Sequence, residues 1–247
     1  MDLRSVVLGI DSPACEMPTS KEEFTCFSKT GSKYYANGNK TDETYREFCK
    51  EVGKDYPKDM SDWRYTKTFH QDTPDKHEYV VQLQNGVSSF NQKECEDSLS
   101  WIIHACDNSE SDNPMKWKGG GRYVRHDGDY KYELHPRRDN RIWPPPRAPY
   151  GMCVSKYNVF WSSYAIVGTG FSTWDHGQKT MRPNMDSCYG SGTTAWKFEY
   201  YDFPSDHNGY EWVATFNTPI WTSARCFQNN KVVKGALGWT DGCMGDD

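Results

Sequence analysis

Several features that mark common protein classes are missing from this chain of 247 residues. No two cysteines are spaced as Cys-x-x-Cys, so the usual signature of a cytosolic zinc or thiol-redox site is absent. No apolar run approaches the roughly 20 residues that span a bilayer, and residues 6–10 are too short for the core of a signal peptide. The net charge of −5 and the lack of a basic stripe disfavour binding to nucleic acid.

Cysteine is abundant, in contrast, and the nine cysteines are spread along the whole chain. This spacing favours long-range disulfides over a local metal cluster and indicates a secreted protein that works outside the cell or in a secretory compartment. We expect at least three disulfides, no cofactor and no metal, with one cysteine unpaired because nine is odd. The cysteines are Cys15, Cys26, Cys49, Cys95, Cys106, Cys153, Cys188, Cys226 and Cys243.

The sequence suggests a short amino-terminal extension followed by one domain. Residues 1–12 have no structural period and are expected to be a tag, linker or propeptide. Residues 13–247 are expected to form a single secreted domain, rich in helix and loop over 13–118 and rich in β-structure over 119–247. The sequon Asn39-Lys40-Thr41 predicts a glycoprotein modified at Asn39 on an exposed turn.

Two segments carry the apolar spacing of helices. In residues 41–52 the apolar stripe ends before Gly53, which is expected to terminate the helix, and its members are Tyr45, Phe48, Cys49 and Val52. In residues 92–106 the stripe consists of Cys95, Leu99, Ile102, Ile103 and Cys106. Cys95 and Cys106 are too far apart on one helix to bond each other, so each must reach elsewhere. We expect Cys49 and the second helix to have different disulfide partners, and both helices to pack on a sheet.

The β-structure is indicated by short runs between turn residues. Residues 78–84 read as a strand stopped by Asn85-Gly86, and Asp127-Gly128 predicts a hairpin after the glycine run 119–121. Further strands are expected at 157–168, 195–201, 210–216 and 220–227, whereas 55–75 reads as loop and 141–149 as a polyproline-like connector. The predicted fold is α+β and disulfide-stapled, with an antiparallel β-sandwich or twisted sheet in the carboxyl-terminal half and two short helices packed on it.

One region resembles a known group of proteins. The run Glu94-Cys-Glu-Asp-Ser-Leu-Ser-Trp-Ile-Ile-His-Ala-Cys-Asp, followed by Asn113-Pro-Met-Lys-Trp-Lys-Gly-Gly, is similar to a segment of small secreted proteins of filamentous fungi. A similar pattern occurs in the non-catalytic carboxyl-terminal region of killer-toxin-like chitinases. The resemblance covers roughly residues 95–243, and the chitinase signature Asp-x-x-Asp-x-Asp-x-Glu is absent. It implies secretion and a role at cell walls or between species, without chitinase activity.

Two groups of residues could serve catalysis if the protein is an enzyme. Asp175 beside His176 could support acid–base chemistry, although a surface loop is the simpler interpretation of the pair. Asp127, Asp129 and Glu133 could supply oxygen ligands for calcium or the two carboxylates of a glycosidase, but the hairpin turn already accounts for the first of them.

Aromatic residues make up 15% of the chain, including 10 Trp and 16 Tyr, and can serve either a core or a sugar-stacking surface. Trp196 and Trp212 are expected in the core. Four others lie beside prolines, glycines or turn residues and are candidate glycan-binding residues, namely Trp143, Trp174, Trp221 and Trp239.

The favoured function is therefore binding of an extracellular or cell-wall glycan by a monomer in interspecies or host interaction. One alternative is a secreted polysaccharide-active hydrolase or lyase. The other is a toxin-like, host-directed effector that binds a host surface protein.

Overall fold

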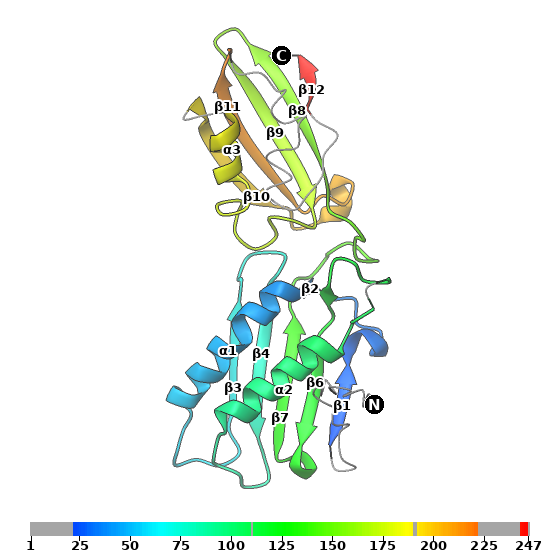
Figure 1. Ribbon diagram of the computed structural model, residues 1–247, viewed down its shortest axis with the longest axis vertical. Coiled ribbons are helices and arrows are strands. Elements are labelled where there is room, and N and C mark those ends of the chain that lie inside the picture. Colours follow the sequence, from blue (N-terminus) through cyan, green and yellow to red (C-terminus); the bar gives the residue numbers. More distant parts are fainter. Residues whose placement is uncertain (1–21, 110, 190–191, 222–242, 247) are drawn as a thin grey trace, which may run out of the picture.

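The computed structural model describes residues 22–109, 111–189, 192–221 and 243–246, which form an α+β fold built around two five-stranded sheets (Figure 1). This confirms the predicted fold class. The first sheet is antiparallel, with strand order β1-β6-β7-β4-β3. Its strands are β1 (Glu23–Cys26), β3 (Arg64–Phe69), β4 (His77–Leu83), β6 (Gly121–Arg125) and β7 (Tyr130–Pro136).

The second sheet has the order β10-β11-β9-β8-β12, and only β12 runs parallel to its neighbour. Its strands are β8 (Tyr150–Asn158), β9 (Trp161–Thr169), β10 (Thr194–Tyr200), β11 (Trp212–Pro219) and β12 (Cys243–Asp246). Its core contains the fully buried Trp212, and Trp196 packs against that core. The helix α3 (Arg182–Tyr189) belongs to this half, and a short 3-10 turn, η4 (Pro204–His207), precedes β11.

Two helices, α1 (Gly38–Asp55) and α2 (Gln92–Ala105), cover one face of the first sheet (Figure 1). The second agrees with the predicted bounds. The first passes through Gly53 instead of ending there and continues to Asp55, after which the Tyr56 amide donates to the carbonyl oxygen of Val52 over 2.9 Å. A two-stranded sheet of β2 (Ala36–Asn37) and β5 (Trp117–Lys118) lies beside the start of α1.

Two disulfides belong to this half. Cys49 bonds to Cys95 between the two helices, so the expectation of different partners was wrong. The reason is that both apolar stripes face the same sheet, which brings the two sulfurs together inside one core. Cys26 bonds to Cys106, and Cys153 is disulfide-bonded as well, which matches the expected minimum of three. The predicted bonding of Cys15, Cys188, Cys226 and Cys243 concerns side chains outside the described residues.

Some local predictions need correction. Residues 55–75 contain β3, an edge strand paired only with β4, and are not a continuous loop. The run 157–168 is divided by a turn at residues 159–160 that joins β8 to β9. Of the run 220–227, only Ile220 and Trp221 are described, and they form a turn after β11.

A buried ionic cluster joins the two halves at the connector between them. The Arg141 side chain, 2% exposed, donates to Glu211 Oε1 over 2.6 Å and lies 3.2 Å from Asp75 Oδ1. The backbone amide of Asp75 donates to the carbonyl oxygen of Thr173 over 3.1 Å. The two sheets keep separate hydrophobic cores, and the expectation that residues 13–247 form a single folding unit stays a prediction.

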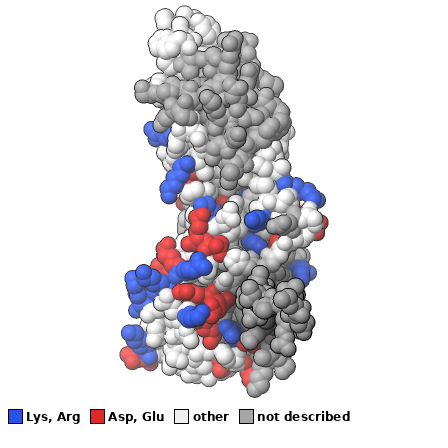
Figure 2. Space-filling view, viewed as in Figure 1, with Lys and Arg blue, Asp and Glu red and all other residues white. Residues whose placement is uncertain are grey.

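Charged side chains of both signs are intermixed on the helix-bearing face of the molecule (Figure 2). In the part of the chain that the structure describes, no helix is long and apolar enough to cross a membrane. The same residues contain no group of three or more His, Cys, Asp or Glu side chains placed to hold a metal ion.

Candidate functional site

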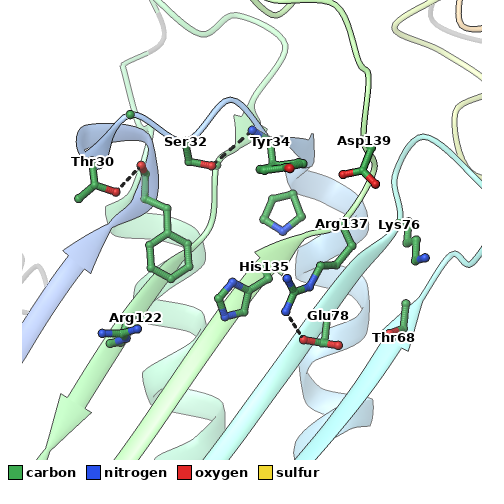
Figure 3. Close-up of a pocket in the computed structure, with 14 residues that line it drawn as sticks. Thr30, Ser32, Tyr34, Thr68, Lys76, Glu78, Arg122, His135, Arg137 and Asp139 are labelled. Carbon is green, nitrogen blue, oxygen red and sulfur yellow. Dashed lines mark hydrogen bonds and ion pairs between the residues drawn. The ribbon is translucent and has the colours of Figure 1, made fainter. Parts of the chain in front are cut away.

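A cavity of about 730 Å³ opens on the face of the first sheet that the helices leave uncovered (Figure 3). Four parts of the chain line it: residues 27–34 after β1, the facing ends of β3 and β4, residues 119 and 122 at the start of β6, and the end of β7 with the residues that follow it. These segments are distant in sequence and meet only because the strand order places β1 and β6 beside β7, β4 and β3.

The floor of the cavity follows from strand alternation on β7. Tyr132 and Leu134 point into the helix-covered core, so Glu133 and His135 point to the opposite face. Glu133 accepts hydrogen bonds from Arg122 Nε at 2.6 Å and from His135 Nε2 at 3.0 Å. Although burial opposes the change, the hydrogen bonds from His135 and Arg122 lower the pKa of Glu133 to about 2. Glu133 is therefore an ionised anchor that orients two side chains of the cavity.

An aromatic wall stands over this floor. The ring of Phe27 stacks on the ring of His135, with centroids 4.9 Å apart and an interplanar angle of 27°. Phe27 begins the 3-10 turn η1 (Phe27–Thr30), directly after the strand β1. Tyr34 stands at the edge of the cavity with 47% of its surface exposed. The wall thus offers flat apolar surface next to hydrogen-bonding groups.

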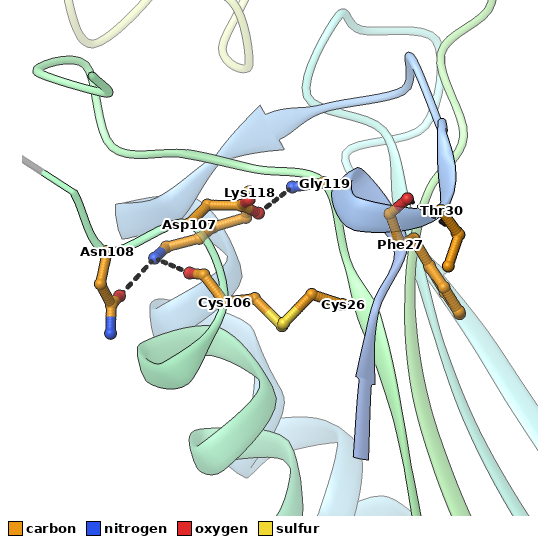
Figure 4. The surroundings of a disulfide bond; sticks show 8 residues. All are labelled: Cys26, Phe27, Thr30, Cys106, Asp107, Asn108, Lys118 and Gly119. Atoms are coloured by element: carbon orange, nitrogen blue, oxygen red, sulfur yellow. Dashed lines mark hydrogen bonds between the residues drawn. A yellow bond between two sulfur atoms is a disulfide. The ribbon is translucent and has the colours of Figure 1, made fainter.

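The position of Phe27 is fixed by a glycine and by a disulfide, and Figure 4 shows the disulfide with Phe27 beside it. Cys26, immediately before it, is bonded to Cys106 at the end of α2, and the Phe27 amide donates to the carbonyl oxygen of Gly120 over 3.0 Å. Gly120 has φ of +81°, and a β-carbon there would lie 2.2 Å from the carbonyl oxygen of Leu134. Only glycine fits between η1 and β7. The glycine run 119–121 therefore supports the cavity wall.

The rim carries charges of both signs. Arg137 donates to Glu78 Oε1 over 2.6 Å. Lys76 and Asp139 also line the cavity, and neither side chain makes a hydrogen bond or ion pair with another described residue. Donors and acceptors are therefore interspersed around one apolar wall, as in sites that bind small polar ligands.

The carboxylate of Asp175, a predicted catalytic residue, is used to hold a loop together. It accepts from the backbone amides of Gly177, Lys179 and Thr180 at 2.8–3.0 Å. The ring of His176 packs on Tyr200 with a centroid distance of 4.7 Å. The structure places the Asp175–His176 pair in a surface loop outside the cavity, as the simpler interpretation expected.

The other three predicted carboxylates are not brought together. Asp127 lies in the turn η2 (His126–Gly128), and Asp129 follows it and accepts from Asn85 Nδ2 at 3.0 Å. Glu133 lies within β7, and its carboxylate is held by Arg122 and His135. The carboxylates of Asp129 and Glu133 therefore each have partners of their own in the protein. Any catalytic role for these residues stays a prediction.

The predicted glycan-binding tryptophans lie in separate places. Trp143 is 50% exposed and lines a neighbouring cavity. Trp174 lies under the ammonium group of Lys40, which is 3.6 Å from the ring centroid. Trp221 is 83% exposed in the turn after β11, and Trp239 lies outside the described residues. None of the first three lines the cavity beside Phe27.

The predicted glycosylation site differs in its local structure from the expectation. Asn39 is exposed, but it lies in the first turn of α1 and not in a loop turn. Its amide donates to the side chain of Asn37, which caps the helix, and the hydroxyl of Thr41 is buried and bonded to the carbonyl oxygen of Gly38. Modification of Asn39 stays a prediction.

Sequence reasoning missed most of this cavity, naming only Glu133 beneath its floor. A usable signal was present in the alternation of Lys131, Glu133 and His135 with Tyr132 and Leu134, which predicts a strand with one polar and one apolar face. No local signal connects that strand with residues 27–34, because their approach depends on the order of strands in the sheet.

Two family models match different parts of the chain. Residues 20–137 match a fungal lectin-type family described as "Putative glycan binding domain", and residues 149–247 match the family described as "Fungal ACT-like domain". No curated protein and no solved structure matches the chain. The matches support a fungal protein with a carbohydrate-binding region, and neither connects the chain with killer-toxin-like chitinases. The first match contains the first sheet and nearly all of the cavity beside Phe27.

Proposed function

We propose that this protein binds a neutral extracellular or cell-wall glycan in the cavity between Phe27 and the uncovered face of the first sheet. The observation that carries the proposal is the stacked pair of Phe27 and His135 above the anchored Glu133, inside the region that matches a glycan-binding family. A sugar ring has an apolar face suited to an aromatic wall and hydroxyl groups that need both donors and acceptors.

The charges of the cavity favour a neutral ligand. Arg122 is paired with Glu133 and Arg137 with Glu78, so these basic groups are already balanced by carboxylates. Planar side chains held in ion pairs also keep a fixed orientation and can donate to adjacent hydroxyls at small entropic cost.

Binding without hydrolysis is favoured by the ionisation of Glu133. A glycosidase needs a carboxylic acid whose pKa is raised, so that it remains protonated and can transfer a proton to the leaving group. The pKa of Glu133 is lowered to about 2, which makes this group a poor general acid. A polysaccharide-active enzyme remains the alternative that the experiment below distinguishes.

Secretion belongs to the same proposal. Disulfides such as Cys26–Cys106 are compatible with an oxidising compartment, where glycans of cell walls and host surfaces are also found. A role in interspecies or host interaction is supported by the resemblance of residues 95–243 to secreted fungal proteins.

The experiment is retention of the purified protein on a panel of β-glucan, chitin, mannan and host-type polysaccharides, with release of soluble products measured in parallel. Phe27→Ala should weaken retention about tenfold, the loss typical of a buried aromatic contact. The matched control is Phe203→Ala, which removes a 55% exposed phenylalanine outside the cavity and should retain full binding.

Each other outcome has a defined meaning. If the wild-type protein releases soluble products and Glu133→Gln does not, the protein hydrolyses the glycan, and the proposal of binding without hydrolysis is wrong. Failure of the wild-type protein to bind any polysaccharide would refute the proposal and favour the effector that binds a protein.

A further inference from the structure

A second cavity, of about 410 Å³, lies beside the first. Its lining includes Tyr34 and Tyr35, and also Trp143 and the prolines 144–146 of the connector. Ser32, Tyr34 and Gly119 line both cavities, so the two are separated by a shared wall and are not remote from each other. Tyr34 stands at the edge of the first cavity in Figure 3.

The connector that carries Trp143 is anchored on both sides of this residue. The Tyr35 hydroxyl donates to the carbonyl oxygen of Ile142 over 3.0 Å, and Trp117 Nε1 donates to the carbonyl oxygen of Pro146 over 2.8 Å. The prolines between these two points restrict the backbone further. The indole of Trp143 is therefore half exposed on a backbone with little freedom, which lowers the entropic cost of using it as a contact surface.

The polar groups at the base of the second cavity are largely committed to the protein itself. Asp107 Oδ2 accepts from the Gly119 amide at 2.9 Å, and the Asn113 side chain bonds the backbone of Trp117 at both of its ends. What remains available to a ligand is mainly the flat apolar surface of Trp143 and Tyr34. A second sugar ring suits such a surface better than a charged group does.

We infer that the second cavity is a further subsite for the glycan of the first. The ligand is then a neutral oligosaccharide that crosses Tyr34, with one sugar unit against Phe27 and another against Trp143. This inference rests on the proposed function and makes the connector part of the binding site. It also predicts that a monosaccharide, which occupies only the first cavity, does not sense a change at Trp143.

The test is isothermal titration calorimetry with neutral oligosaccharides of one to six units in four series: β-1,3-glucose, β-1,4-glucose, β-1,4-N-acetylglucosamine and α-1,6-mannose. Affinity in the series that binds should rise with length and then level off. Trp143→Ala should lower affinity for the longer members about tenfold and leave the monosaccharide unchanged. Trp143→Phe, which keeps an aromatic ring, should restore most of the loss.

Two comparisons separate the possible failures. Phe27→Ala should weaken all lengths, and Trp221→Ala, which removes an exposed indole from the turn after β11, should weaken none. A wild-type affinity independent of length, or equal losses in Trp143→Ala and Trp221→Ala, would overturn the second subsite while leaving the first intact. Absence of binding in all four series, together with no retention on any polysaccharide of the panel, would overturn both proposals.

Discussion

Replacing Arg141 by methionine should strongly destabilise the protein. Arg141 is buried, and its guanidinium faces two carboxylates, Asp75 and Glu211, which are themselves fully buried. It also donates to the carbonyl oxygens of Tyr35 and Pro74 at 2.9 and 3.1 Å. The substitution keeps most of the side-chain volume but leaves two negative groups facing each other without a cation.

The size of the effect follows from this arrangement. Removing one partner of a buried ion pair costs about 3–5 kcal/mol, and the presence of two carboxylates places Arg141→Met near the upper end. Burial raises the pKa of Asp75, and Arg141 counteracts this rise, so its loss raises the pKa of Asp75 further. A carboxyl whose pKa is raised on folding stabilises the fold below its unfolded pKa, and that contribution is lost as the pH rises. The deficit of the variant should therefore be large at pH 7 and shrink toward pH 4.

The assay is urea denaturation followed by tryptophan fluorescence at pH 7 and pH 4.5. The expected loss of unfolding free energy is equivalent to a fall of roughly 10 °C in the melting temperature. Lys93→Met is the control, because the Lys93–Asp97 pair is exposed on α2 and should contribute at most about 0.5 kcal/mol. The triple variant that also carries Asp75→Asn and Glu211→Gln should recover part of the stability, since the unpaired charges are gone.

A loss below about 1 kcal/mol for Arg141→Met at pH 7 would show that the buried cluster does not behave as an ion pair. The same experiment tests whether residues 13–247 form one folding unit. A single transition in the wild type that splits into two in Arg141→Met would show that the two sheets unfold together only while the cluster joins them.

Three further predictions concern the first sheet. Because the pKa of Glu133 lies near 2, its ionised form should add about 3 kcal/mol of stability above pH 4.5, lost as the pH falls through 2. Glu133→Gln should therefore be less stable than the wild type at pH 7 and equal to it near pH 2 in urea titrations, and equal stability at pH 7 would contradict this. Burial lowers the pKa of His77 to about 4, so as the pH falls the unfolded chain takes up a proton before the folded protein does. The free energy of unfolding of the wild type should therefore fall by about 3 kcal/mol between pH 6.5 and 4. His77→Gln should flatten this dependence, and an unchanged slope would assign the acid sensitivity to another group. The double variant Cys26→Ser/Cys106→Ser opens a loop spanning 80 residues, should cost about 4 kcal/mol in denaturation, and should weaken glycan retention by releasing Phe27. Undiminished retention would show that the wall does not depend on the disulfide.

The two helices over the first sheet could be predicted because the information is local. Each has an apolar stripe of helical period, and each begins at an asparagine whose side chain accepts from backbone amides of the first turn, Asn37 for α1 and Asn91 for α2. The hairpin of β6 and β7 was equally local, since Asp127 and Gly128 both adopt the positive φ angles that Asp-Gly favours.

The strands β3 and β8 were missed for different physical reasons. β3 has the sequence Arg-Tyr-Thr-Lys-Thr-Phe and depends on pairing with β4, which a single sequence does not reveal. β8 begins soon after three prolines, and its turn into β9 contains Val159 and Phe160 in place of the usual Asn-Gly. These residues are 70% and 80% exposed, which an apolar run does not predict.

The candidate site could not be predicted because it depends on contacts between distant segments. Phe27 and His135 are more than a hundred residues apart, and their stacking requires the strand order of the first sheet. The same is true of Cys26 and Cys106, whose pairing is one of many that nine cysteines allow. Only the polar face of β7 was available from its own sequence.

The buried cluster at the connector also limits how this chain can be recombined. Arg141 lies between the two regions that match separate families, residues 20–137 and 149–247, and belongs to neither. Its two carboxylate partners come from opposite sides, Asp75 from the first region and Glu211 from the second. A chimera that joins either region to a foreign partner would carry over only part of this set and bury unbalanced charge at the new boundary. Exchange of these regions between proteins should therefore succeed only where all three positions are transferred or replaced together.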